Sequence, residues 1–231
     1  MVKVTNDIEK IRLKRGFEPE DKLKFDTNSR PKGMPPATYT AAKNAVVRSC
    51  LRVGVKFIAY MILHKIVNEK FKGEFALNSV LVAFGNKFLV ENNDYGMVII
   101  DRLPETAQAY GMLKRKFQVG LQIASTGGTI KVPRVLMYAT TCDGASHLSS
   151  AVDIVLGSLR YVVNQRHNSN QSTVTQTLLN NVANMMYYRK KGDEILVRER
   201  GLILRPKAIS HPPYRQEYDD LVSYLALLSV D

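Results

Sequence analysis

The stretch YGMVIIDR (residues 95–102) sets the fold class expected of this chain. Its run MVII is apolar at consecutive positions, which is typical of a strand buried on both faces of a parallel sheet. Such a strand normally closes on Gly, Asn or Pro, yet here Asp101 and Arg102 follow at once. Asp101 is therefore either a turn former or a carboxylate at the carboxyl end of a strand, where open α/β sheets gather their functional groups.

The segments on either side alternate between strand and helix patterns. Near-continuous apolar runs predict two more strands in 56–67 and 134–145, and VKVT at the start also has a β-like pattern. Helical spacing predicts helices in 37–54, 74–93, 104–123 and 146–164. Gly54 is placed as a C-cap and Ser146 as an N-cap. The alternation predicts an α/β fold with a mostly parallel sheet.

The pattern changes beyond residue 173. An amphipathic helix is expected in 173–191, a hairpin in 194–209 that turns near Arg200 and Gly201, and a terminal helix in 217–230. We expect residues 1–165 to form the core and residues 166–231 to form a helix–hairpin–helix appendage packed on it.

The chain is strongly basic, with 33 Lys and Arg against 21 Asp and Glu and a formal net charge of +12. Such an excess favours nucleic acid as a partner, because each neutralised phosphate releases counterions, although a merely well-solvated surface is the alternative. Tyr187 and Tyr188 offer stacking planes beside one basic cluster. The candidate nucleic-acid-binding residues are Lys114, Arg115, Lys116, Arg189, Lys190, Lys191, Arg198 and Arg200.

The two cysteines, Cys50 and Cys142, are too few and too far apart for a disulfide scaffold or a zinc knuckle. The first residues lack the apolar stretch of a signal peptide, and no apolar run reaches membrane-spanning length. We therefore expect a cytoplasmic protein with no membrane partner.

Three carboxylates are candidate metal ligands. Asp101 and Asp143 follow predicted strands, and Asp153 lies on the flank of an apolar helix stripe, an expensive position for an anion unless a cation or donor meets it. Together they could hold Mg²⁺ or Mn²⁺ against a phosphodiester, with His147 assisting proton transfer. The structural alternative is that Asp101 caps a helix, Asp143 forms a turn, Asp153 pairs with an arginine and His147 is a surface residue.

The order of three motifs resembles a bacterial and phage family, the domain-of-unknown-function 3800 family. These motifs are KLKFD at 22–26, YGMVIIDR, and SHLSSAVDIVLGSLRY at 146–161. The resemblance covers roughly residues 5 to 165 and implies a ribonuclease-H-like mixed sheet flanked by helices. It also implies catalytic roles for Lys24, Asp101 and Asp153.

The chain departs from this family in two places. Residues 150–153 read Ser-Ala-Val-Asp where the family has Gln-Leu-Ala-Asp, and no Asp-Glu-Ser-Gly strand precedes Lys24. In the family that strand supplies a metal ligand, so its loss should cripple hydrolysis unless the true start lies upstream of Met1. The missing strand would also expose a sheet edge, which predicts a dimer or a partner strand.

Two functional hypotheses follow. The first is a nucleic-acid-binding, ribonuclease-H-like protein that cuts phosphodiester bonds with Mg²⁺ or Mn²⁺. The alternative is a catalytically inactive binding or assembly module of a phage or bacterial defence system.

Overall fold

The structure is a computed structural model of the 231-residue chain. It describes residues 2–62, 69–101, 107–123, 127–141, 145–167, 172–207, 209 and 211–226, with the backbone alone at 69–72, 107, 108 and 194. The chain divides into two compact units. Unit 1 comprises residues 1–57, 143–186 and 211–231, and unit 2 comprises residues 58–142 and 187–210.

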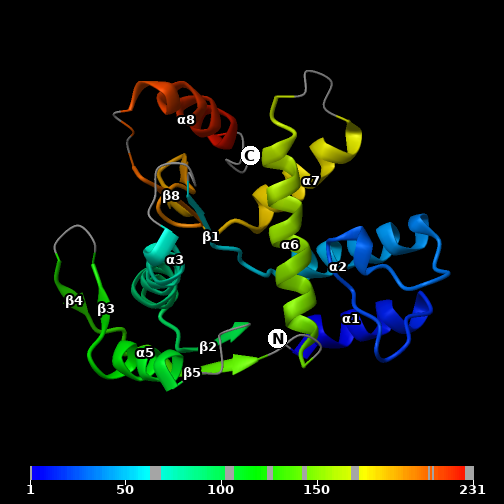
Figure 1. Ribbon diagram of the computed structural model, residues 1–231, viewed down its shortest axis with the longest axis horizontal. Helices are drawn as coiled ribbons and strands as arrows, with labels where there is room; N and C mark the ends of the chain where they lie inside the picture. Colours follow the sequence, from blue (N-terminus) through cyan, green and yellow to red (C-terminus); the bar gives the residue numbers. More distant parts are fainter. Residues whose placement is uncertain are drawn as a thin grey trace. The chain divides into compact units, whose positions relative to one another are not determined.

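Unit 1 is helical over its described residues (Figure 1). Its first helix, α1, replaces the β-like start predicted at residues 2–5, and that prediction was wrong. Val4 and Ile8 are both buried and lie four residues apart, so the apolar period is that of a helix. The helices of unit 1 are α1 (Val2–Lys14), the 3₁₀ turn η1 (Thr27–Ser29), α2 (Pro36–Val53), α6 (His147–Asn164), α7 (Thr173–Met185) and α8 (Pro212–Leu225).

Helices α2 and α6 confirm the predicted caps. Gly54 has φ 76° at the end of α2, and its N–H donates to the carbonyl groups of Cys50 and Leu51. Ser146 accepts a hydrogen bond from the N–H of Leu148 at 3.1 Å and so begins α6. Buried side chains of α1, α2, α6 and α7 form one apolar core in unit 1.

A loop residue, Phe25, contacts both α2 and α6. Its N–H donates to Asp153 Oδ2 at 2.7 Å, and its carbonyl oxygen accepts from Lys43 Nζ at 2.9 Å. Its ring lies over Gly157, where an added Cβ would stand 2.2 Å from Phe25 Cγ. The loop can therefore pack against α6 only because residue 157 has no side chain.

Replacing Gly157 by Ala should lower the free energy of unfolding by about 1–3 kcal/mol, because the Phe25 ring must move out of its packed position. Chemical denaturation followed by circular dichroism measures this change. The matched control is Gly111→Ala in a helix of unit 2, where an added Cβ meets nothing within 4 Å, and this variant should be neutral or more stable. An equal change in the free energy of unfolding for Gly157→Ala and Gly111→Ala would contradict this packing of Phe25 on Gly157.

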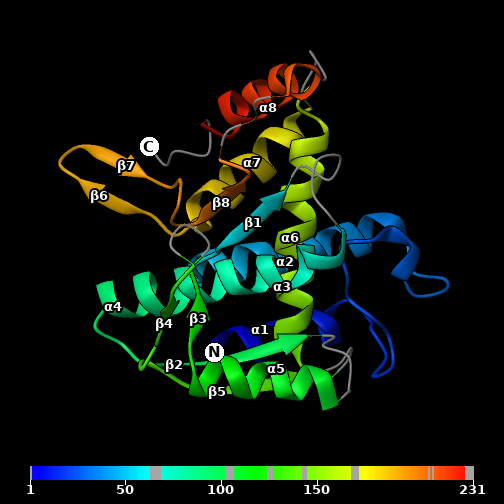
Figure 2. The same ribbon diagram turned by 60° about the vertical axis from the view of Figure 1, so that its left-hand side comes forward.

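Unit 2 combines short strands with helices (Figure 2). Its helices are α3 (Glu69–Val82), the π-helical η3 (Ala83–Phe88), α4 (Leu89–Glu91) and α5 (Ala107–Gln118). Its strands are β1 (Ala59–Ile62), β2 (Gly96–Asp101), β3 (Leu121–Gln122), β4 (Thr129–Ile130), β5 (Val135–Thr141), β6 (Arg189–Lys191), β7 (Glu194–Leu196) and β8 (Leu202–Arg205).

The strands pair in four separate two-stranded sheets over the described residues. β1 pairs with β8 and β2 with β5, both in parallel, while β3–β4 and β6–β7 are antiparallel. The mixed α/β class predicted from the sequence is confirmed. The single sheet of a ribonuclease-H-like fold is not formed by these pairings and stays a prediction.

The central strand β2 is not buried on both faces as predicted. Met97 and Ile99 are 49% and 50% exposed, whereas Val98 packs against the core of unit 2. The reason is that this core lies on one side of the strand only, so burial alternates along it.

The prediction of a hairpin in 194–209 is also wrong. β7 pairs instead with β6, where Lys191 stands opposite Glu194, and Gly192 at φ 62° with Asp193 makes a two-residue turn. β8 pairs with β1, so residues 202–205 leave the hairpin altogether. Residues 166–231 are divided between the two units and do not form one body in this division.

No helix among the described residues is both long enough and apolar enough to cross a membrane.

Candidate nucleic-acid interface

The antiparallel hairpin of β6 and β7, which we call the ribbon, carries a cluster of cations in unit 2. Strand β6 consists of Arg189, Lys190 and Lys191, all exposed, and exposed Arg198 follows β7. Residues 187–210 contain seven Lys and Arg against three Asp and Glu. No ion pair links Arg189, Lys190 or Lys191 to another side chain that the structure describes. We call Arg189, Lys190, Lys191 and Arg198 the hairpin surface.

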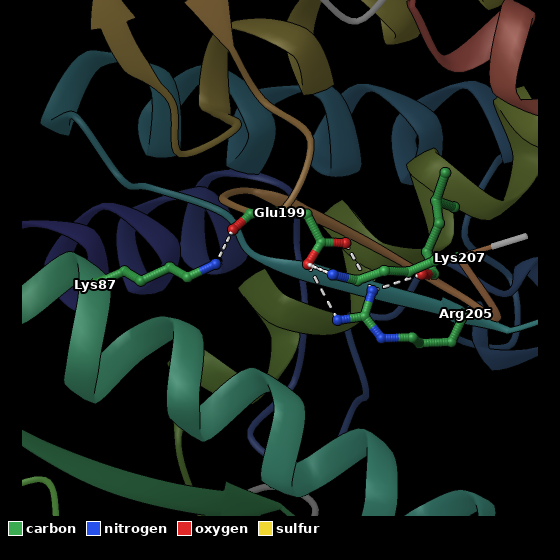
Figure 3. A network of polar contacts seen from close by, with 5 residues as sticks. Lys87, Glu199, Arg205 and Lys207 are labelled. Carbon is green, nitrogen blue, oxygen red and sulfur yellow. Dashed lines mark hydrogen bonds and ion pairs between the residues drawn. The ribbon is translucent and has the colours of Figure 1, made fainter. Parts of the chain in front are cut away.

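A polar network lies at the base of this ribbon and centres on Glu199 (Figure 3). Arg205 donates to both carboxylate oxygens of Glu199, at 2.6 and 3.1 Å, and Lys207 Nζ lies 3.6 Å from Oε2. Lys87 in η3 donates to the backbone oxygen of the same residue. The chain that follows β7 is thus tied to β8 and to η3.

Glu199 has a backbone φ of 61°, a region that non-glycine residues rarely occupy. Its N–H donates to the carbonyl oxygen of Leu202 at 2.8 Å, which closes a tight turn before β8. The ionic contacts of its side chain help to offset the free-energy cost of this backbone conformation.

The charges of the network shift the pKa values of its members. Burial alone would raise the pKa of Glu199, but the hydrogen bonds and charge of Arg205, with Lys207 and Lys87, outweigh burial and lower it. Burial lowers the pKa of Lys87, and the nearby charge of Arg200 lowers it further. The carboxylate is therefore held ionised, and the ammonium group of Lys87 lies in a cation-rich environment.

A second ion pair fixes the start of the ribbon. Arg200 Nη2 lies 3.1 Å from Glu91 Oε1, and the hydroxyl of Tyr187 donates to Glu91 Oε2. The ring of Tyr187 is buried edge-on against Phe88, at 5.1 Å between centroids, and burial with the Glu91 contact raises its pKa. Tyr187 is thus not an open stacking plane, and Arg200 is engaged inside the unit, so both predictions need correction.

Lys116 is likewise removed from the predicted surface. Its side chain is buried, with Nζ 3.4 Å from Glu74 Oε1 and 3.3 Å from Asn78 Oδ1. It shares the inner face of α5 with buried Ala109 and Leu113, at helical spacings of seven and three residues. Lys114 and Arg115 are exposed, and their role in binding nucleic acid stays a prediction.

Sequence reasoning missed Glu199, Lys87 and Glu91, which fix the ribbon. The local signal for Glu199 was an acid between two arginines in RER at 198–200, directly before a buried strand. No local signal indicates Lys87 or Glu91, because their partners lie far along the chain.

Replacing Glu199 by Gln should lower the free energy of unfolding by about 1 kcal/mol near neutral pH, because Arg205 loses a charged acceptor. The pKa of Glu199 is lowered in the fold, so its ionised form stabilises the protein above the usual carboxyl value of 4.5 and this contribution is lost as the pH falls. The stability difference between wild type and variant should therefore shrink below that pH in denaturation curves.

The control is Asp193→Asn in the exposed turn, which removes the same charge and should change stability by less than about 0.5 kcal/mol. A Glu199→Gln loss that persists unchanged at low pH would contradict the ionic role of Glu199.

The predicted metal ligands fall in different parts of the chain. Asp101 ends β2 in unit 2 and is exposed, Asp153 belongs to α6 in unit 1, and Asp143 lies outside the described residues. Over the residues that the structure describes, no group of three or more His, Cys, Asp or Glu side chains could hold a metal ion. The Mg²⁺ or Mn²⁺ site therefore stays a prediction.

Asp153 has a structural partner instead. We predicted that either a cation or a donor meets this carboxylate, and the N–H of Phe25 donates to it at 2.7 Å. The backbone N–H of adjacent Lys24 donates to the Tyr39 hydroxyl at 3.0 Å, so the KLKFD segment is fixed by its main chain. His147 is the first residue of α6 and is half-buried. Lys24, His147 and Asp153 all lie in unit 1.

Replacing Asp153 by Ala should lower the free energy of unfolding by about 1–3 kcal/mol, because the Phe25 N–H loses its acceptor. Asp153→Asn keeps an acceptor oxygen, so its free energy of unfolding should fall clearly less than that of Asp153→Ala. Urea denaturation checks both variants, with exposed Val152→Ala on the same helix as the control. If Asp153→Ala were as stable as the wild type, this hydrogen bond would contribute nothing to the free energy of unfolding.

Comparisons of the chain with protein-family models, with curated proteins and with solved structures find no match.

Proposed function

We propose that this protein binds nucleic acid through the hairpin surface of unit 2. The observation that supports this proposal best is the row of three exposed cations on β6, which have no ion-pair partner among the described side chains. Acids elsewhere in unit 2, such as Glu91 and Glu199, are already paired with arginines. The positive charges of the hairpin surface are therefore available to bind an external polyanion.

The form of the ribbon suits a phosphate backbone. Successive strand residues point to opposite faces, so Lys190 projects on one side and Arg189 and Lys191 on the other. The Glu199 network holds the base of the ribbon, which limits the conformational freedom that binding must remove. Phosphate contacts of this kind supply affinity but carry no sequence information.

Binding without turnover is the form of the proposal that we favour. Hydrolysis would require Asp101 and Asp153 to share a metal ion, and Asp153 already accepts a hydrogen bond from Phe25. The ribonuclease-H-like fold, the family resemblance, the metal-dependent nuclease, the role in a phage or defence system and the dimer stay predictions.

Changing Arg189, Lys190 and Lys191 together to Gln should weaken binding to oligonucleotides of any sequence. The slope of log K against log salt concentration should become shallower by about 2 for a single strand, because each lost phosphate contact removes about 0.7. Fluorescence anisotropy between about 50 and about 200 mM salt measures both quantities.

The control carries the same charge change in unit 1, with exposed Lys3, Lys10 and Lys14 of α1 changed to Gln. An equal loss in both variants would mean that net charge alone drives binding, and no loss in the hairpin variant would refute the proposed surface. Incubation of the labelled strand with Mn²⁺ separates binding from turnover, since cleavage abolished by Asp101→Asn would restore the nuclease hypothesis.

A further inference from the structure

A groove of about 410 Å³ lies in unit 2, lined by four residues of α5 and by residues 136–140 of β5. Helix α5 runs alongside β5 (Figure 2). Ligand sites in proteins have volumes of about 300–1,000 Å³, so the space is large enough for a small planar group.

Aromatic side chains and a cation line this groove. Tyr110 and Phe117, seven residues apart on one face of α5, are 49% and 54% exposed, and exposed Lys114 lies between them. The ring of Phe117 stands edge-on to that of Tyr138 in β5, at 6.2 Å and 88°. Unpaired nucleobases stack on exposed aromatic rings, and a neighbouring cation can contact their phosphates.

We infer that the α5–β5 groove binds unpaired bases of a single-stranded nucleic acid, with Phe117 and Tyr110 as stacking residues and Lys114 as a phosphate contact. This inference rests on the proposed function and names its substrate class. Bases in a duplex are stacked on each other and present only their edges, so a groove of this kind selects single strands.

Charge complementarity favours a polyanion as the occupant. The two exposed charged residues of α5, Lys114 and Arg115, are both cations, and β5 carries no charge. In Figure 2 the β6–β7 hairpin lies at one end of unit 2 and the α5–β5 pair at the other, so residues of the two can be altered independently. A strand long enough to reach both would be held by its phosphates at the ribbon and by its bases at the groove.

The test uses the full chain and a single strand that carries one 2-aminopurine, whose fluorescence reports stacking. Phe117→Leu keeps an apolar side chain without a π face and should weaken single-strand binding at least about fivefold, since a stacked base contributes about 1–3 kcal/mol. Phe117→Tyr should bind within about twofold of wild type. Neither should change the salt slope, and duplex affinity should stay constant.

The outcomes separate this inference from the proposed function. If Phe117→Leu and Phe117→Tyr bind the single strand equally well while the hairpin variant binds weakly, the groove assignment is wrong and the hairpin surface stands. If the groove variants lose affinity and the hairpin variant does not, the groove assignment stands and the hairpin surface is wrong. A self-association that Phe117→Leu abolishes in sedimentation, without any effect on nucleic acid, would assign the groove to a second copy of the chain. Circular dichroism establishes that each variant is folded.

Discussion

The carboxylate of Glu199 is the constraint on which the described arrangement of unit 2 depends. It accepts two hydrogen bonds from Arg205 in β8, while the backbone of the same residue accepts from Lys87 in η3. Helix η3, which is distant in sequence, therefore meets the turn before β8 at one residue, which itself occupies a left-handed conformation. Together with the Arg200–Glu91 pair, this anchor supports the β6–β7 ribbon, since an isolated two-stranded hairpin is only marginally stable in water.

Local features of the sequence predicted two helices of unit 1 well, α2 and α6, but not α1. Helices α2 and α6 lie within a residue or two of their expected bounds, and Gly54 and Ser146 cap them as expected. Caps and helical periodicity depend on residues within one or two turns, so a single sequence contains the needed information. For Asp153 the flank position on an apolar stripe predicted that a cation or a donor would meet it, but not that the donor would be Phe25, which is 128 positions away.

Strand partners and the state of individual charges could not be predicted in the same way. Strand β8 pairs with β1, and Lys87 binds a residue 112 positions away, so no local pattern specifies either contact. Lys116 and Tyr187 looked like members of surface clusters because composition does not show on which face of an element a side chain lies. The three-residue spacing of Lys116 from Leu113 was the available signal.

The interleaved path of the chain affects how the protein can fold during synthesis. The chain passes between the two units four times, at residues 57, 142, 186 and 210. Helix α2 must wait for α6 and α7 to emerge from the ribosome before the core of unit 1 can close, and β1 must wait for β8. Both units thus depend on closing long loops, which slows folding and leaves apolar surface open to chaperones in the interval.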